Sequence, residues 1–86
     1  MHYPIRVLFL CTGNSARSQM AEGLLRSCGS ADFEVHSAGV DPKGLNPLAV
    51  EAMREADIDI RGHHSKSHER YLWHSFDYII TVCDCA

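Results

Sequence analysis

VLFLCTGNSARSQM, residues 7–20, is the stretch that decides the fold of this 86-residue chain. Its first part, Val7 to Cys11, is a continuous apolar run, which predicts a short buried β-strand. A helical pattern follows from about Ala16, and we expect Gly29 to end that helix. The stripe of the helix expected to be buried consists of Met20, Leu24 and Cys28, with Ala21 and Leu25 beside it. A buried strand that leads through a short turn into a helix is the first half of a βαβ unit.

The rest of the chain continues this alternation of strands and helices. Phe33 to Ala38 predicts a second strand, and Asn46 followed by Pro47 predicts the N-cap and first residue of a second helix. The apolar face of the second helix is expected to consist of Leu45, Ala49, Ala52, Met53 and Ala56. The remaining elements expected are a polar loop, a short helix and a third strand, over 57–66, 68–73 and 77–82 respectively. The predicted fold class is therefore α/β, an open parallel sheet with a βαβαβ core and helices on both faces, and we expect residues 1–86 to form a single domain.

The composition is that of an ordinary globular protein, with 45% apolar and 22% charged residues. A net charge of −3 argues against general binding to nucleic acid or to anionic membranes. No apolar run approaches the roughly 20 residues that a membrane-spanning helix needs, and the N-terminus lacks the features of a signal peptide. We therefore expect a cytoplasmic protein.

The four cysteines of the chain are Cys11, Cys28, Cys83 and Cys85. In a small secreted domain they would form a disulfide framework, but without an export signal catalytic or redox roles are favoured for some of them. We expect no metal centre, because the spacing of the last two cysteines and the nearby histidines matches no common zinc pattern. Those histidines, which we expect in surface loops, are His63, His64, His68 and His74.

The loop between the first strand and the first helix has the composition of an oxyanion site. Arg17 follows Cys11 by six positions, and the backbone N–H groups between them, at a helix N-terminus, suit a tetrahedral anion. Arg17 adds two parallel charge-assisted hydrogen bonds. The same surroundings favour the thiolate form of Cys11, while Gly13 and Asn14 tolerate the left-handed backbone of a tight loop. The expected oxyanion-binding residues are Thr12, Gly13, Asn14, Ser15, Ala16 and Arg17.

The residues alone leave two alternatives open in this loop. A cysteine at the end of a strand is often only a small buried apolar side chain, but the spacing to Arg17 and the Gly-Asn pair favour a catalytic role for Cys11. Ser15 and Ser18 either cap the first helix or hydrogen-bond to the thiolate.

These residues carry a family resemblance. Residues 11–17 match the C-x5-R loop of the low-molecular-weight protein tyrosine phosphatase fold, and residues 11–22 resemble more closely the thioredoxin-coupled arsenate reductases built on that fold. Gln19 is the informative position, because the phosphatases usually carry proline there. Further segments that resemble the reductases, in the same order, are Ser37 to Gly39, Asn46 to Met53, Asp57 to Ile60 and Thr81 to Asp84. The resemblance extends over essentially the whole chain.

The resemblance implies an activity and a redox relay. In the arsenate reductases the residue that matches Cys11 attacks arsenate, the one that matches Arg17 holds the oxyanion, and the one that matches Cys83 then forms a disulfide with the nucleophile. Thioredoxin is the implied electron donor, and no tightly bound cofactor is implied. Cys85 is the remaining candidate for the second resolving cysteine of the family. The family fold also continues further, so we expect this chain to lack its C-terminal strand and helix and to associate with itself through the exposed sheet edge.

The resemblance also implies a site for a monovalent cation beside the loop. The matching positions are Asn14, Glu22, Ser37 and Lys66, where a carboxylate stands in place of the lysine in some relatives. The Lys66 ammonium is therefore a substitute for the cation, or else a solvated lysine in a polar loop.

The sequence as a whole leaves three candidate functions. They are arsenate reduction with arsenate as the substrate oxyanion, phosphomonoester hydrolysis through a cysteinyl-phosphate at Cys11, and oxyanion binding by an inactive fragment.

Overall fold

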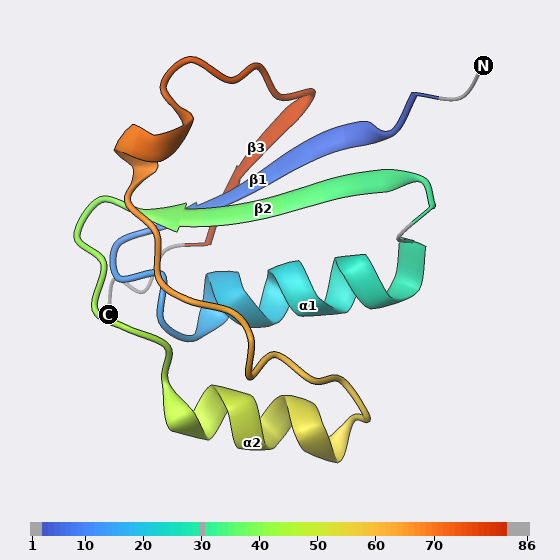
Figure 1. Cartoon of the computed structure of the whole chain (residues 1–86), viewed down its shortest axis with the longest axis vertical. Coiled ribbons are helices and arrows are strands. Elements are labelled where there is room, and N and C mark those ends of the chain that lie inside the picture. The colour runs from blue at the N-terminus through green and yellow to red at the C-terminus, as the bar shows by residue number, and fades with distance from the viewer. Residues whose placement is uncertain (1–2, 30, 83–86) are drawn as a thin grey trace.

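The computed structural model describes residues 3–29 and 31–82 of the chain. Its elements, in order, are β1 (Ile5–Cys11), α1 (Arg17–Gly29), β2 (Phe33–Gly39), α2 (Pro47–Glu55), the 3-10 helix η1 (His68–Tyr71) and β3 (Tyr78–Thr81). The strands form one parallel sheet in the order β2-β1-β3 (Figure 1). This arrangement confirms the predicted fold class. Cys83 and Cys85 lie outside the described residues.

The helix starts follow local chemistry closely. Asn46 is the N-cap of α2, where its side chain accepts a hydrogen bond from the backbone N–H of Leu48 at 2.8 Å, and Pro47 is the first helical residue. Ser67 caps η1 in the same way, by accepting from the N–H of Glu69. The short helix expected over 68–73 is therefore a single 3-10 turn that ends at Tyr71.

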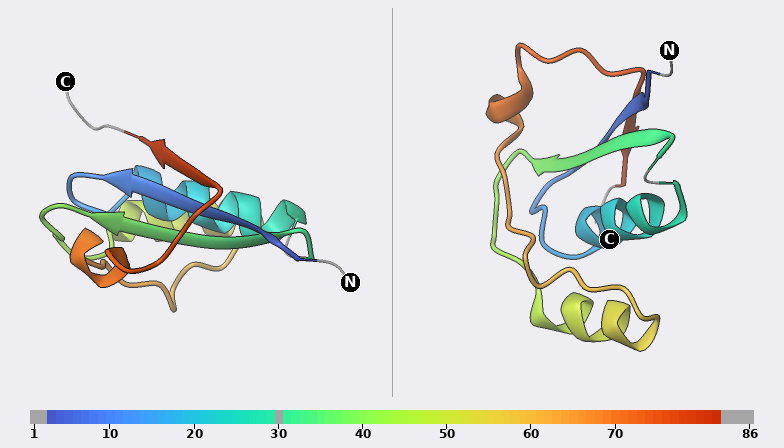
Figure 2. Two further views of the ribbon diagram at one scale, coloured as in Figure 1. Left: turned by 90° about the horizontal axis from the view of Figure 1, so that it is seen from above. Right: turned by 45° about the vertical axis from the view of Figure 1, so that its right-hand side comes forward.

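The sheet is covered on its two faces by different elements (Figure 2). On one face, Val7, Phe9 and Val35 pack against Ala21 and Leu25 of α1, and α2 packs on the outer side of α1. On the opposite face the core is formed by Leu8, Ala38 and Tyr71, with Leu10 and Phe76 packed against them. The segment that carries η1 is therefore the cover of the second face.

The buried sides of the helices differ from the apolar stripes predicted. In α1, Leu24 is 47% exposed and Cys28 is exposed, while the buried residues are Ser18, Gln19, Glu22 and Gly23. In α2, Ala49 and Met53 are buried as expected, but Ala52 and Ala56 are exposed. Met20, Ala21 and Leu25 pack against the cores as expected, but the prediction was wrong for Leu24 and Cys28. The helix is enclosed by the sheet, by α2 and by the 58–66 segment, so part of its buried surface meets polar partners. Gly23 allows the close approach of that segment, since an added Cβ would lie 2.8 Å from Ile60 Cγ2.

The third strand lies at the edge of the sheet and is exposed. Tyr78, Ile79 and Ile80 are 60%, 59% and 42% exposed. Among residues 3–29 and 31–82, no helix is long and apolar enough to cross a membrane.

Candidate active site

The loop after β1 is shaped by hydrogen bonds from the chain that follows β2. The carbonyl groups of Cys11, Thr12, Gly13 and Ser15 accept, in order, from the N–H groups of Val40, Asp41, Lys43 and Asn46, at 2.8–3.1 Å. Because these carbonyls point toward the 40–46 segment, the N–H groups of the loop are free to face the opposite way. A loop of this kind presents donors to an anion.

The Cys11 sulfur lies among donors. Cys11 is 7% exposed, and its Sγ receives a hydrogen bond from the backbone N–H of Asn14 at 2.9 Å. Ser18 Oγ lies 2.8 Å from the same sulfur and itself accepts from Asn14 Nδ2 at 2.8 Å. The hydroxyl of Ser18 and the backbone N–H of Asn14 therefore both contact the sulfur and orient it.

Asn14 fixes the loop from the inside. It is fully buried and has a φ of 46°, the left-handed conformation expected for it. Its carbonyl oxygen accepts from Gln19 Nε2 at 3.0 Å and from Ser65 Oγ at 2.7 Å. Its Oδ1 accepts from the backbone N–H of Lys66 at 2.8 Å and from Gln19 Nε2 at 3.2 Å. The 64–66 segment therefore positions Asn14, and Asn14 in turn contacts the Cys11 sulfur.

Close packing of β2 against the loop completes this arrangement. At Gly39, which pairs with Cys11 in the sheet, an added Cβ would lie 2.6 Å from the carbonyl oxygen of Thr12 and 2.9 Å from Asn14 N. Glycine is therefore required there. A shallow cavity of about 190 Å³ is lined by Leu10, Cys11, Thr12, Val40 and Thr81.

Arg17 is the first residue of α1 and is exposed, at the end of the loop. Ser15 and Ala16 are partly buried between Asn14 and the helix, whereas Thr12 is exposed beside the cavity. The structure thus brings the predicted oxyanion-binding residues into one loop around Cys11. The proposed partner of Cys11 in the redox relay, Cys83, lies outside the described residues.

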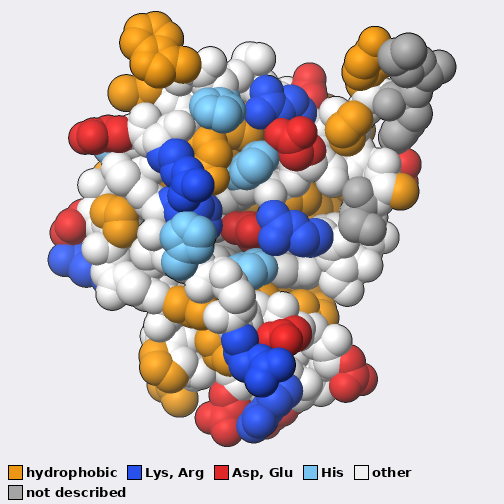
Figure 3. Space-filling model, viewed as in Figure 1, with side chains coloured by type: hydrophobic (Ala, Val, Ile, Leu, Met, Phe, Trp, Pro, Cys, Tyr) orange, Lys and Arg blue, Asp and Glu red, His pale blue; other side chains and the backbone are white. Residues whose placement is uncertain are grey.

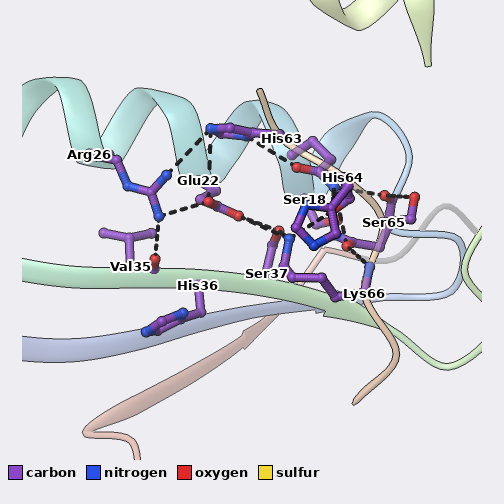
Figure 4. Close-up of polar contacts among 12 residues, drawn as sticks. Ser18, Glu22, Arg26, Val35, His36, Ser37, His63, His64, Ser65 and Lys66 are labelled. Atoms are coloured by element: carbon purple, nitrogen blue, oxygen red, sulfur yellow. Dashed lines mark hydrogen bonds and ion pairs between the residues drawn. The ribbon is translucent and has the colours of Figure 1, made fainter. Parts of the chain in front are cut away.

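A second polar cluster surrounds Glu22 next to the loop (Figure 4). The Glu22 carboxylate, 4% exposed, lies 2.7 Å from Arg26 Nη2 and 3.8 Å from Lys66 Nζ, and it accepts from the Ser37 hydroxyl. Lys66 Nζ also donates to Ser37 Oγ at 3.5 Å and to the carbonyl of His64 at 2.8 Å. Burial lowers the pKa of Lys66, and Glu22 opposes that shift.

His63 belongs to the same cluster, contrary to the surface position expected for it. Its side chain is 14% exposed, with Nε2 at 3.9 Å from Glu22 and 3.4 Å from Arg26, and Nδ1 at 3.2 Å from Gln19 Oε1. Burial lowers the pKa of this ring. His64 and His74 are exposed as expected. No local pattern distinguishes His63 from His64, so the sequence held no signal for this contact.

Basic, acidic and histidine side chains are mixed across the middle of the face that includes this cluster (Figure 3). The two networks, around Cys11 and around Glu22, are joined through Asn14, Gln19 and Lys66. Asn14, Glu22, Ser37 and Lys66, the positions expected to form a cation site or its substitute, therefore lie together, with an ammonium group already among them.

Comparison with known proteins gives consistent results. The family model for low molecular weight phosphotyrosine protein phosphatase matches residues 6–86. Arsenate reductase of Staphylococcus xylosus is 46% identical over 80 residues, which are 93% of this chain and 61% of that protein. The solved structure described as an arsenate reductase in the phosphate binding state superposes with a TM-score of 0.88 at 36% identity, over 95% of this chain and 63% of that one.

A thioredoxin-dependent arsenate reductase of Corynebacterium glutamicum has a TM-score of 0.83 at 32% identity, and the match covers 100% of this chain and 47% of that one. The chain thus spans about 61% of the length of the Staphylococcus xylosus relative.

Proposed function

The chain belongs to the low molecular weight phosphotyrosine protein phosphatase family, and we propose that within this family its activity is the reduction of arsenate to arsenite. The observation that carries the proposal is the Cys11 sulfur, which accepts a hydrogen bond from the Asn14 N–H and lies 2.8 Å from Ser18 Oγ, in a loop whose carbonyls at residues 11–13 and 15 are bonded to the 40–46 segment. The similarity to arsenate reductases favours arsenate over a phosphate ester as the substrate.

The first step is attack by the Cys11 thiolate on the arsenic atom of arsenate. An As–S bond forms, and one arsenate oxygen leaves as water after taking up protons. The backbone N–H groups of residues 12–16 and the Arg17 guanidinium hold the remaining oxygens, which carry the negative charge. Ser18, through its hydrogen bond to Sγ, keeps the sulfur oriented.

The second step transfers the electrons. The thiol of Cys83 attacks Cys11 Sγ, the S–S bond forms as the As–S bond breaks, and the electron pair of that bond stays on arsenic as arsenite leaves. In total, arsenate and two thiols become arsenite, one disulfide and water. A dithiol reductant of the thioredoxin class then reduces the disulfide, in line with the thioredoxin dependence of the Corynebacterium glutamicum relative. Cys85 is the candidate for passing the disulfide to that reductant.

A coupled assay tests this function. The chain is supplied with arsenate, thioredoxin, thioredoxin reductase and NADPH, and arsenite is measured alongside the hydrolysis of an aryl phosphate. We expect arsenite formation that is abolished in Cys11→Ser and in Cys83→Ser, with the oxyanion still bound by Cys83→Ser. Arsenite formation at the same rate in Cys83→Ser would contradict the relay.

Hydrolysis of phosphomonoesters is the second candidate function, because the matched family model is that of a phosphatase. A cysteinyl-phosphate at Cys11 needs the same loop and no second thiol. Aryl phosphate hydrolysis that survives Cys83→Ser, in the absence of arsenate reduction, would establish this alternative. Phosphate that raises the melting temperature without turnover of either substrate would indicate oxyanion binding alone.

We also propose that the Lys66 ammonium takes the place of a monovalent cation beside the loop. Its distances of 3.8 Å to Glu22 and 3.5 Å to Ser37 put one positive charge where the oxygen atoms of the cluster converge. A cation and this ammonium would repel each other in so small a space, so the residues present do not fit an added ion.

The variant Lys66→Met, which keeps the length of the side chain without its charge, tests this substitution. We expect the melting temperature of the wild type to be the same in potassium and in tetramethylammonium chloride. The variant should be more stable in potassium, by about 1–3 kcal/mol when the ion is well above its dissociation constant. A variant indifferent to potassium would argue for a solvated lysine.

A further inference from the structure

A chain of hydrogen bonds runs from His63 to the nucleophile. His63 Nδ1 contacts Gln19 Oε1 at 3.2 Å, Gln19 Nε2 contacts Asn14 Oδ1 at 3.2 Å, Asn14 Nδ2 contacts Ser18 Oγ at 2.8 Å, and Ser18 Oγ contacts Cys11 Sγ at 2.8 Å. The members inside the protein, Asn14, Ser18 and Gln19, are all fully buried. The ring of His63 stands at the outer end, where the side chain is 14% exposed.

The orientation of the Gln19 amide is determined by its surroundings. Its Nε2 faces three oxygen atoms, the carbonyls of Asn14 and His64 at 3.0 and 2.9 Å and Asn14 Oδ1 at 3.2 Å. The reversed amide would set an oxygen against three acceptors, so Oε1 must face His63. Because an amide oxygen only accepts, His63 carries its hydrogen on Nδ1.

The nearest polar neighbour of the other ring nitrogen agrees with this tautomer. His63 Nε2 lies 3.4 Å from Arg26 Nη1, a group that only donates, and the Glu22 carboxylate is further away, at 3.9 Å. A neutral ring with its hydrogen on Nδ1 accepts from Arg26 and donates to Gln19, which satisfies both nitrogens. Arg26 is itself held by Glu22 at 2.7 Å and by the carbonyl of Val35 at 2.6 Å (Figure 4).

We propose that His63 is a positioning residue of the Cys11 loop. Its Nδ1–H fixes the Gln19 amide, the amide holds both oxygens of Asn14, and Asn14 in its left-handed conformation keeps its backbone N–H on the Cys11 sulfur. Without this donor, Oε1 of a fully buried glutamine loses its partner, and the amide is free to turn or withdraw. The inference rests on the proposed role of Cys11 as the nucleophile and adds the residue that keeps its surroundings in place.

The experiment compares two variants of equal size, His63→Leu and His63→Asn. The asparagine amide restores a donor near the position of Nδ1, whereas leucine fills the same volume without one. The second-order rate of Cys11 alkylation by iodoacetamide is measured on the folded chain at pH 7.5 by peptide mass spectrometry, with the exposed Cys28 as internal reference. The matched control is His74→Leu, which removes a histidine outside the hydrogen-bond chain.

We expect His63→Leu to slow Cys11 alkylation about threefold or more, a size typical of coupling within a buried network. His63→Asn should recover most of the wild-type rate, and His74→Leu should match the wild type. A His63→Leu rate equal to that of the wild type, or a His63→Asn rate as low as that of His63→Leu, would overturn the proposal.

A second measurement needs no variant and decides the matter if His63→Leu does not fold. The ¹⁵N shifts of the His63 ring at pH 7.5 report its tautomer, and we expect the hydrogen on Nδ1; a hydrogen on Nε2 would exclude the donation to Gln19. Neither measurement involves arsenate. If Cys11 of the wild type reacts no faster than Cys28, the proposed nucleophile itself fails, whereas an activated Cys11 that is indifferent to His63 removes this inference alone.

Discussion

The inner side of α1 and the strand β3 reverse the usual relation between polarity and burial. Around α1, Asn14, Ser18, Gln19 and Ser37 are 0% exposed and Glu22 is 4% exposed. In β3, by contrast, the three apolar residues of 78–80 are between 42% and 60% exposed. Polar side chains fill the interior at one end of the sheet, and apolar side chains meet the solvent at its edge.

The difference shows that this chain also buries polar side chains where each of them has a partner. Each buried polar side chain around α1 has a partner at hydrogen-bond or ion-pair distance, so the cost of removing it from water is offset. The residues of β3 pair with β1 through the backbone only along one edge, and nothing in the described residues covers their side chains. The first region contains the residues of the proposed site, and the second leaves apolar side chains exposed along an edge of the sheet.

The largest effect that would test this comparison comes from removing the charge at the centre of the buried cluster. In Glu22→Ala the Lys66 ammonium, with its side chain 9% exposed, loses its carboxylate. We expect the free energy of unfolding to fall by about 3–5 kcal/mol, the usual result of leaving one buried charge unpaired. Denaturant unfolding measures this change.

The control is Glu51→Ala, which breaks an exposed pair with Arg54 at 3.4 Å and should change the free energy of unfolding by no more than about 0.5 kcal/mol. The double variant Glu22→Ala, Lys66→Met removes both charges and should regain part of the loss. Equal effects of Glu22→Ala and Glu51→Ala would mean that the cluster contributes nothing beyond a surface pair.

The elements that sequence analysis predicted well are those set by neighbours along the chain. The apolar run of β1, the Asn46-Pro47 start of α2 and the left-handed Asn14 are local features. The last two lie at the residues expected, and β1 ends at Cys11 as expected but begins two residues earlier, at Ile5. The β3 strand was found to within one residue at each end, because β-branched and aromatic residues concentrate there.

The burial of Gln19 and Glu22 on α1 was not predicted, because it depends on partners from other parts of the chain. A search for apolar spacing assumes that a helix buries its apolar stripe, but Gln19 and Glu22 are buried because partners from residues 63–66 and β2 meet them there. Those partners are more than ten residues distant in sequence, and their side chains follow no period. The contacts of His63 could therefore be recognised only from the folded structure.

A smaller effect concerns the stability of the same region at mildly acidic pH. Burial lowers the pKa of His63 from 6.5, so between 6.5 and the lowered value the unfolded chain binds a proton that the folded chain does not. The free energy of unfolding should therefore fall as the pH falls through this window. Above pH 6.5 the His63 ring is neutral in both states, so this destabilisation is absent there. Thermal melts from pH 7.5 to pH 5 measure the slope.

His63→Asn, which cannot titrate, should flatten that slope, while His74→Asn should leave it close to that of the wild type. The scan stops at pH 5 because the pKa of Glu34, lowered from 4.5 by its hydrogen bonds to His36 and Arg6, makes the carboxylate a source of stability that is lost only at more acidic pH. A slope that is the same in the wild type and in His63→Asn would contradict the burial of a neutral ring.

The smallest change in folding stability is expected in the exposed strand β3. Ile79 is 59% exposed, so Ile79→Lys removes little buried apolar surface and should alter the free energy of unfolding by no more than about 0.5 kcal/mol. Its effect on association should be much larger, because a lysine on an edge strand opposes pairing with the edge of a second chain. We expect the wild type to gain apparent mass with concentration in light scattering and Ile79→Lys to remain monomeric. The control is Leu48→Lys, since Leu48 is 73% exposed on α2, away from the sheet edge, and this variant should associate like the wild type. A wild-type chain that stays monomeric at every concentration would show that the exposed residues of β3 are not a surface for self-association, and association retained by Ile79→Lys but lost in Leu48→Lys would move that surface to α2.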